Sequence, residues 1–266
     1  MQRLLPLFIL CAFVFFPRPA GAQLLIEEGK VKLSVSPAEN IVNSITVHNT
    51  SNEEIAVKVY WQDFNYVEPF DGKKAFLPPG SIQNSMTKWI TFSPQEFVLA
   101  PLSKRKVTYT INVPKDAQGG HYGVLFFEKG AKQTLDRTAV RLIARVGCLF
   151  FLESKDKKKT ATVEALKVAG QRILGDLHNT GDVILLAQGI YYIMDKEGLV
   201  VHRGETDKMY LPPGAKSGFS ASVAVQIPSG TYTLVLTFDL EDGDTLVKEI
   251  DFAKQNEAIN MLQVRD

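Results

Sequence analysis

The sequence predicts an all-β protein of two β-sandwich domains in tandem, and three observations support this. Apolar and polar side chains alternate over short stretches such as 55–61 and 107–113, which is the period-two pattern of half-buried strands. Beyond residue 22, no stretch shows a convincing helical period longer than about two turns. The tripeptide His-Asn-Thr occurs at 48–50 and again at 178–180, a spacing of 130 residues, which indicates a unit built twice.

The first 22 residues have the composition of a secretory signal peptide. Arg3 forms a short positive head before the apolar run 4–16, and Ala20-Gly21-Ala22 supplies small residues for cleavage. This run is too short to span a membrane as a helix, so we expect an exported chain without stable membrane insertion. Loss of Arg3 and Arg18 takes the net charge from +1 to −1, a balance that does not favour nucleic-acid binding.

Both copies of the tripeptide lie in a polar turn between two predicted strands. The strands at 41–47 and 55–61 flank the first copy, and those at 173–177 and 183–194 flank the second. Asn and Thr side chains satisfy the backbone groups of turns, which explains the tripeptide without any catalytic chemistry. Each copy is therefore expected to mark the same corner of two related domains.

The chain downstream of each tripeptide runs through the same series of elements. A short strand, a turn with proline, an alternating strand and a Pro/Gly corner precede Tyr122 in the first copy and Tyr232 in the second. A tyrosine just past such a corner of an immunoglobulin-like sandwich hydrogen-bonds back to nearby backbone. The sequence thus predicts two immunoglobulin-like β-sandwich domains in which Tyr122 and Tyr232 have the same role. The first copy is longer, and 63–88 is interpreted as its insertion.

These elements divide the chain into five segments. We expect a signal peptide at 1–22, an N-terminal domain at 23–154, a charged linker at 155–160, a C-terminal domain at 161–255 and a tail at 256–266. The lysine-rich linker is interpreted as a solvated joint rather than as a basic binding site. The tail lies beyond the last predicted strand and is interpreted as a short helix or a disordered end.

Residues that carry catalysis or bind metals show no recognisable arrangement, so we expect no enzyme, no cofactor and no metal site. The four histidines lack the spacing of a helical zinc site. Cys148 is the one cysteine after the signal peptide, which excludes an intrachain disulfide, and its apolar strand indicates a small buried hydrophobe. The acidic run 239–244 is interpreted as a hairpin turn rather than a calcium loop, because it places Asp-Gly between apolar strands.

The stretch 139–153 is the strongest candidate for a functional surface. It is apolar on both faces toward its end, whereas an antiparallel strand with one face in water alternates. Two explanations remain open: its second half is buried between the domains, or it forms an edge on which an extended partner segment adds a strand. The face that includes Phe150 is expected to serve the sandwich core. The opposite face carries the candidate partner-binding residues Arg141, Ile143, Arg145, Leu149 and Phe151.

A signal peptide followed by two immunoglobulin-like domains resembles the periplasmic pilus-chaperone (PapD-like) family. The residues that carry the resemblance are those at 45–49, the Phe-Val-Leu-Ala-Pro turn at 97–101 and the Leu-Phe-Phe run at 149–151. The stretches 113–128 and 141–153 are also similar to the extracellular domains of the WxL-type cell-wall-binding family. Both resemblances imply the sandwich fold.

The resemblance to pilus chaperones also implies a function. It implies a non-enzymatic chaperone-like protein, periplasmic or otherwise extracytoplasmic, that binds an exported polypeptide or a surface-structure subunit by β-strand addition to the last strand of the first domain. The alternative is a cell-envelope structural or carbohydrate (peptidoglycan)-binding module. The family holds the C-terminal carboxylate of its subunit with two basic residues. Their positions here fall on Cys148 and near Leu33, with Lys30 and Lys32 close by.

Overall fold

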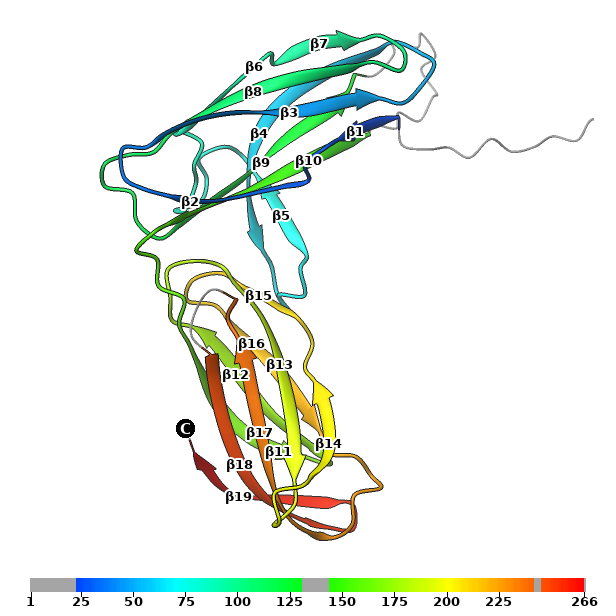
Figure 1. Cartoon of the computed structure of the whole chain (residues 1–266), viewed down its shortest axis with the longest axis vertical. Coiled ribbons are helices and arrows are strands. Elements are labelled where there is room, and N and C mark those ends of the chain that lie inside the picture. Colours follow the sequence, from blue (N-terminus) through cyan, green and yellow to red (C-terminus); the bar gives the residue numbers. More distant parts are fainter. Residues whose placement is uncertain (1–22, 131–143, 242–244, 266) are drawn as a thin grey trace, which may run out of the picture.

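The computed structural model describes residues 23–130, 144–241 and 245–265. Within these ranges the regular elements are all β-strands, and they form two sandwiches that follow one another along the chain (Figure 1). The tandem all-β fold predicted from the alternating pattern is therefore confirmed. The predicted signal peptide at 1–22 lies outside the described residues.

Domain one consists of a four-stranded and a six-stranded sheet. In spatial order the first sheet contains β1 (Leu24–Ile26), β3 (Asn40–Asn49), β8 (Lys104–Asn112) and β6 (Ile90–Ser93). The second sheet contains β2 (Lys30–Val35), β10 (Arg145–Ser154), β9 (Gly120–Lys129), β4 (Ile55–Tyr66) and β5 (Lys74–Leu77), with β7 (Glu96–Leu99) beside β4. The chain changes sheets at its start, because β1 pairs with β3 whereas β2 pairs in parallel with β10.

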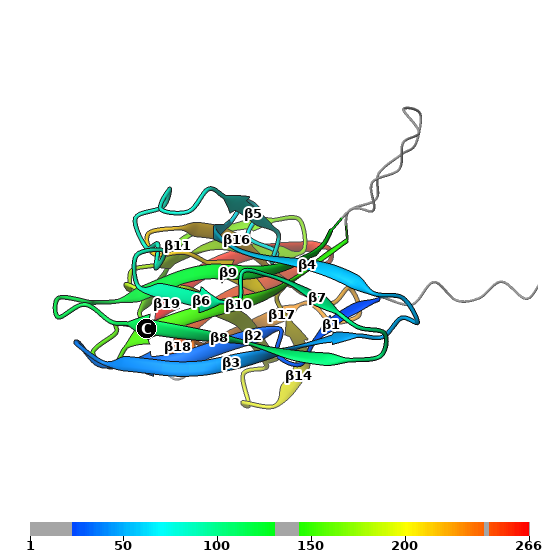
Figure 2. The same cartoon turned by 90° about the horizontal axis from the view of Figure 1, so that it is seen from above.

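Domain two repeats the plan with a three-stranded and a six-stranded sheet. The first contains β11 (Ala161–Ala169), β12 (Arg172–Asn179) and β16 (Lys216–Ser222). The second contains β14 (Val200–Glu205), β13 (Leu185–Met194), β17 (Gly230–Asp239), β18 (Thr245–Gln255) and β19 (Ala258–Arg265), with β15 (Met209–Leu211) beside β13. Seen from above, β5 lies at the margin of domain one, over the part of domain two that contains β16 (Figure 2).

Each sandwich has its own core, because the apolar side chains of both sheets point inward at alternate positions. In β4 the side chains of Ile55, Val57 and Val59 are buried, and the residues between them, Ala56 and Lys58, are exposed. In β10 Phe150 and Leu152 are fully buried in the core of domain one, as the alternation predicted. Burying a side chain of this size contributes about 1.5–3 kcal/mol to folding.

The first His-Asn-Thr corner is built around a buried amide. Asn49 is 2% exposed, and its Nδ2 donates to the carbonyls of Glu53 at 2.7 Å and Ala100 at 2.9 Å. Its Oδ1 accepts a hydrogen bond from the backbone N–H of Ser51 at 2.9 Å. The side chain therefore ties the turn after β3 to the turn after β7.

The second corner repeats this arrangement in domain two. The fully buried Asn179 donates from Nδ2 to the carbonyls of Val183 at 2.8 Å and Leu211 at 2.9 Å, and its Oδ1 accepts from the N–H of Gly181 at 2.9 Å. The interpretation of the tripeptide as a structural corner made twice is confirmed.

The tail beyond residue 255 was predicted wrongly. It forms β19, which pairs antiparallel with β18 from Glu249 opposite Arg265 to Gln255 opposite Ala258. Ile259 is 3% exposed and belongs to the core of domain two. The segment has only a short apolar alternation of its own, and it becomes a strand because β18 offers it a free edge. Domain two therefore continues through β19.

The charged linker is held more closely than a solvated joint would be. Lys159 is 6% exposed, and its ammonium lies 3.3 Å from the carboxylate of Glu241. The N–H of Lys158 donates to the Asp182 carboxylate at 2.7 Å, and the N–H of Asp182 donates back to the carbonyl of Lys158 at 3.1 Å. These bonds attach the end of the linker to domain two, while Lys155, Asp156, Lys158 and Thr160 are exposed.

The two corner tyrosines have different roles, contrary to the prediction. The hydroxyl of Tyr232 donates to the carbonyl of Pro228 at 2.9 Å, which is the expected tyrosine corner. The hydroxyl of Tyr122 instead accepts a hydrogen bond of 2.7 Å from the N–H of Ile184 in domain two. Tyr122 lies at the end of domain one that faces domain two, so its hydroxyl reaches a backbone group across the joint.

Replacing each tyrosine by phenylalanine should separate these roles. Tyr232→Phe loses one hydrogen bond within domain two and should lower the free energy of unfolding of that domain by about 1 kcal/mol. Tyr122→Phe leaves the buried N–H of Ile184 without an acceptor, which should cost about 1–3 kcal/mol. Calorimetry measures both losses, and hydrogen exchange should speed up at the Ile184 amide in Tyr122→Phe only. Unchanged exchange there would contradict the cross-domain role.

Candidate functional site

The candidate strand β10 has a strand partner on one side along nearly its whole length, but on the other side only in its second half. β9 pairs with it from Arg145 to Glu153, whereas β2 pairs with it from Leu149 to Ser154. From Arg145 to Cys148, the side of β10 away from β9 pairs with no strand among the described residues. The strand β1 lies close to β10, but its backbone pairs with β3 in the opposite sheet.

The backbone of this open edge points hydrogen-bonding groups outward. Successive residues of a strand direct their N–H and C=O groups to opposite sides. The N–H of Leu149 donates to the carbonyl of Gly29 on the β2 side at 3.0 Å, and the carbonyl of Ala144 accepts from β9 at 2.9 Å. By this alternation, the N–H and C=O groups of Arg145 and Gly147 face the open edge.

The side chain of Arg145 lies across the outer face of the sheet, the face directed away from the core. Its guanidinium donates to the hydroxyl of Tyr60 at 3.1 Å and to Oε1 of Gln62 at 3.2 Å. It also lies 4.1 Å from the ring centroid of Phe126 and 5.5 Å from that of Phe76. Contacts of this kind contribute about 0.5–2 kcal/mol each. The charge of Arg145 is therefore held beside the open edge.

The other four candidate residues differ in position. Arg141 and Ile143 lie outside the described residues. Leu149 shares the outer face of β10 with Arg145 and is half-buried. Phe151 shares that face too, but it is 7% exposed and packs against Phe64 at a centroid distance of 5.6 Å. Its side chain is thus buried in an aromatic cluster on the outer face rather than offering an exposed contact.

Aromatic side chains cover the outer face of the six-stranded sheet and continue into domain two. Sequence reasoning missed this surface, although a signal was present: the run from Tyr122 to Phe127 contains no charged residue and does not alternate between apolar and polar. Such a run is typical of a strand covered on both faces, and β9 is buried at each of these positions. This outer aromatic cluster consists of Phe64, Tyr66, Tyr122, Val124, Phe126, Phe151 and Ile184, bordered by half-buried Tyr60, Phe70, Leu149 and Tyr210.

Two lysines lie against this cluster. The ammonium of Lys30, from β2, lies 4.8 Å from the ring centroid of Phe151. The ammonium of Lys74, from β5, lies 4.7 Å from the centroid of Tyr66 and 6.0 Å from that of Tyr210. Burial, and secondarily the positive charge of Lys30, lowers the pKa of Lys74. Lys30 and Lys74 thus both place a positive charge against the rings of the outer aromatic cluster.

The two positions that the pilus-chaperone resemblance assigns to basic residues hold no cation. Cys148 is fully buried in the core of domain one, and burial raises the pKa of its thiol to about 12. Leu33 is half-buried against the same core. Lys32 points to domain two, where its ammonium lies 2.9 Å from Glu241. Only Lys30 among the neighbouring lysines named from the sequence reaches the outer aromatic cluster.

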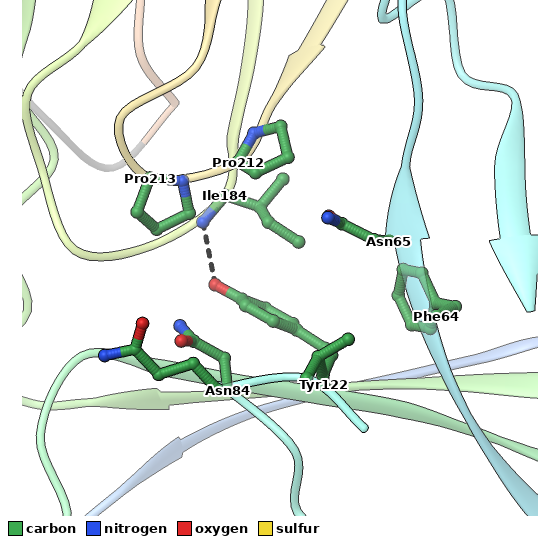
Figure 3. Close-up of a pocket in the computed structure, with 9 residues that line it drawn as sticks. Phe64, Asn65, Asn84, Tyr122, Ile184, Pro212 and Pro213 are labelled. Carbon is green, nitrogen blue, oxygen red and sulfur yellow. Dashed lines mark hydrogen bonds between the residues drawn. The ribbon is translucent and has the colours of Figure 1, made fainter. Parts of the chain in front are cut away.

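A cavity of about 190 Å³ lies between the domains, next to this cluster (Figure 3). Figure 3 shows Asn65 and Tyr122 on its domain-one side and Ile184 with Pro212 on its domain-two side. Its walls are uncharged, and the hydrogen bond between Tyr122 and Ile184 forms part of them.

The described residues contain no group of three or more His, Cys, Asp or Glu side chains placed to hold a metal ion. In the same ranges, no helix is long and apolar enough to cross a membrane.

Comparison with known proteins identifies the fold. No known family model and no curated protein matches the chain. Among solved structures, a chain of the chaperone–tip adhesin complex of CFA/I fimbriae biogenesis is 14% identical, with a TM-score of 0.54 over 90% of this chain and 98% of that one. The class 5 fimbriae chaperone CfaA is 15% identical, with a TM-score of 0.53 over 84% of this chain and 97% of that one. The chain has the two-domain PapD-like fold of the pilus chaperones.

Proposed function

We propose that this chain is a non-enzymatic, extracytoplasmic chaperone-like protein that captures an exported subunit of a surface structure. Capture takes place by addition of a partner strand to the open edge of β10. The observation that carries this proposal is that, among the described residues, the side of β10 away from β9 has no strand partner from Arg145 to Cys148, whereas the neighbouring β9 pairs with both β10 and β4. An unpaired edge with outward N–H and C=O groups is the template that β-strand addition requires.

The side chains around the edge indicate which partner would fit. Leu149 and Phe76 present apolar surface on the outer face, and Phe76 is 39% exposed. A partner segment with apolar side chains at alternate positions would place one set against this surface. The likeness in fold to a fimbriae chaperone supports a partner of the same kind, a surface-structure subunit, and hence a periplasmic location.

The cations at the far end of this face suit a carboxylate of the partner. Lys30 and Lys74 come from β2 and β5 and lie over the aromatic rings at the domain joint. An arriving carboxylate would relieve their mutual repulsion in a partly desolvated place, where charge-assisted hydrogen bonds are strong. We assign to Lys30 and Lys74 the binding of the partner's C-terminal carboxylate. Pilus chaperones use two basic residues for this, at positions that fall here on Cys148 and near Leu33.

Strand addition can be tested at Arg145 without disturbing the bonds to β9. Arg145→Pro removes an N–H that faces the open edge, and proline is tolerated at such unpaired edge positions. Arg145→Ala removes the same side chain but keeps the N–H, which makes it the matched control. Against a panel of ten-residue peptides with alternating apolar side chains, we expect Arg145→Pro to bind at least about tenfold more weakly than Arg145→Ala, the equivalent of about 1.4 kcal/mol.

Two further measurements decide how the peptide is held. The amides of Arg145 and Gly147 should exchange more slowly with solvent when a peptide is bound to the wild-type protein. Two sets of peptides can be N-methylated at every second residue, one at odd and one at even positions. Only the set whose methylated N–H groups face β10 should lose binding. If no peptide of the panel binds, or if bound peptides leave both amides unprotected, the proposed mode of capture is wrong.

A further inference from the structure

Within the segment 63–88, residues 63–77 form a hairpin that reaches from domain one to domain two. β5 pairs with the end of β4, from Asp63 opposite Leu77 to Tyr66 opposite Lys74. Figure 1 shows this hairpin below the sandwich of domain one, directed toward β15, and Figure 2 shows β5 outside that sandwich. The turn between the two strands therefore lies beside domain two.

The root of the hairpin is fixed by a buried carboxylate. Asp63 is fully buried, and its two oxygens accept hydrogen bonds from the N–H of Ser81 at 2.9 Å, the hydroxyl of Ser85 at 2.7 Å and the hydroxyl of Thr87 at 3.0 Å. These bonds hold the return of the chain against β4. The base of the hairpin is therefore tied to domain one by side-chain hydrogen bonds.

The tip is held by Tyr210 of β15. The rings of Tyr66 and Tyr210 stack with a centroid distance of 4.9 Å and an interplanar angle of 24°. The N–H of Tyr210 donates to the carbonyl of Phe70 at 2.8 Å, and the hydroxyl of Ser217 donates to the carbonyl of Pro69 at 3.1 Å. One stacked ring, two hydrogen bonds and the packing of Phe70 against the core of domain two thus join the tip to domain two.

The turn is also shaped to admit this ring. Gly72 has a φ of 106°, which a residue with a Cβ rarely adopts. A Cβ added there would lie 3.0 Å from Cε2 of Tyr210. The glycine therefore permits both the turn and the close approach of the tyrosine.

Lys74 depends on the same contact. Its ammonium donates to the carbonyl of Gly72 at 3.1 Å and lies over the rings of Tyr66 and Tyr210. Removal of the Tyr210 ring would take away one wall of this position and expose the ammonium to water.

We infer that Tyr210 is a positioning residue: through it, domain two holds the tip of the hairpin, from Tyr66 to Lys74, and with it the charge of Lys74, at the outer face of domain one. Domain two thereby completes a surface that domain one alone presents only in part. The consequence for peptide capture rests on the proposed function, because it requires Lys74 to contact the partner.

The first test measures the hairpin itself and needs no ligand. In Tyr210→Ala, the amides of Phe70 to Lys74 should exchange about two- to tenfold faster, the range expected for the loss of one aromatic pair. The ammonium of Lys74 should titrate at higher pH than in the wild type. NMR on the protein with ¹³C-dimethylated lysines follows this titration, and Lys74→Arg assigns the Lys74 signal. Tyr210→Phe keeps the ring and should match the wild type in both respects.

Two variants make this result specific. Gly72→Ala disturbs the same stack from domain one and should reproduce the effects of Tyr210→Ala, even if the latter proves poorly folded. Tyr192→Ala removes a tyrosine that is 37% exposed on β13 and should change neither the amides nor Lys74. Wild-type exchange and wild-type titration of Lys74 in both Tyr210→Ala and Gly72→Ala would overturn the inference.

The second test joins the hairpin to capture. For a peptide that ends in a free carboxylate and binds the wild-type protein, Tyr210→Ala should raise the dissociation constant about two- to tenfold, and the C-terminally amidated peptide should lose this difference. An equal loss for both peptides would overturn the link to Lys74. Should no peptide bind the wild type, the proposed function fails, while the exchange and titration measurements still decide the role of Tyr210.

Discussion

Phe150→Ala is expected to unfold domain one under conditions where the wild-type protein is folded. Phe150 is fully buried in the middle of β10, with its ring centroid 5.4 Å from that of Trp61 and 5.0 Å from that of Tyr109. Truncation removes the transfer free energy of the ring and leaves a cavity between the two sheets, which costs about 3–5 kcal/mol. That loss is a large part of the stability of a domain of this size.

Thermal and urea unfolding followed by tryptophan fluorescence would measure this loss, because Trp61 and Trp89 both belong to domain one. Phe76→Ala is the matched control, since Phe76 lies on the same sheet but is 39% exposed. It should lose only its contacts with Arg145 and Phe126, about 1 kcal/mol. Similar losses in both variants would contradict the assignment of Phe150 to the core face of β10.

Asn49→Ala and Asn179→Ala should each destabilise their own domain by about 2–5 kcal/mol. Each substitution removes a buried amide that bridges two turns, and each buried carbonyl or N–H left without a partner costs about 1–3 kcal/mol. Alanine cannot replace these bonds, and water has little access to groups next to a side chain that is 2% or 0% exposed. The effects should be similar because the two corners have the same geometry.

Calorimetry should show a lowered unfolding temperature of domain one in Asn49→Ala and of domain two in Asn179→Ala. Thr180→Ala is the control from the same tripeptide, because its hydroxyl makes an exposed hydrogen bond to Thr160 at 3.0 Å. Its loss should stay within about 0.5 kcal/mol. If Asn179→Ala is no more harmful than Thr180→Ala, the buried amide is not what holds the corner.

Local pattern was sufficient wherever a side chain faces the core of its own domain. The alternation in β4 and β10 predicted which residues are buried, because a strand points successive side chains to opposite faces. The repeated tripeptide predicted two related corners, since a turn is closed by side chains within the same short segment. The role of Tyr232 was predictable for the same reason: its acceptor, Pro228, is four residues away.

Local pattern was misleading wherever the partner of a residue comes from the other domain or from a strand edge. Tyr122 has the sequence context of Tyr232, yet its hydroxyl bonds to Ile184, 62 residues away. The tail lacks a strong strand signal and forms β19 because β18 has a free edge beside it.

The candidate surface shows both cases. Sequence alone determined that β10 is apolar on both faces and that Arg145, Leu149 and Phe151 share one of them, since side-chain direction follows from spacing along a strand. Tertiary structure alone decided that β2 covers only the second half of β10, that Phe151 is buried at the joint and that Lys74 reaches the same face. These three features depend on how separate sheets and domains pack together. Contacts between residues so far apart along the chain produce no periodic pattern in the sequence.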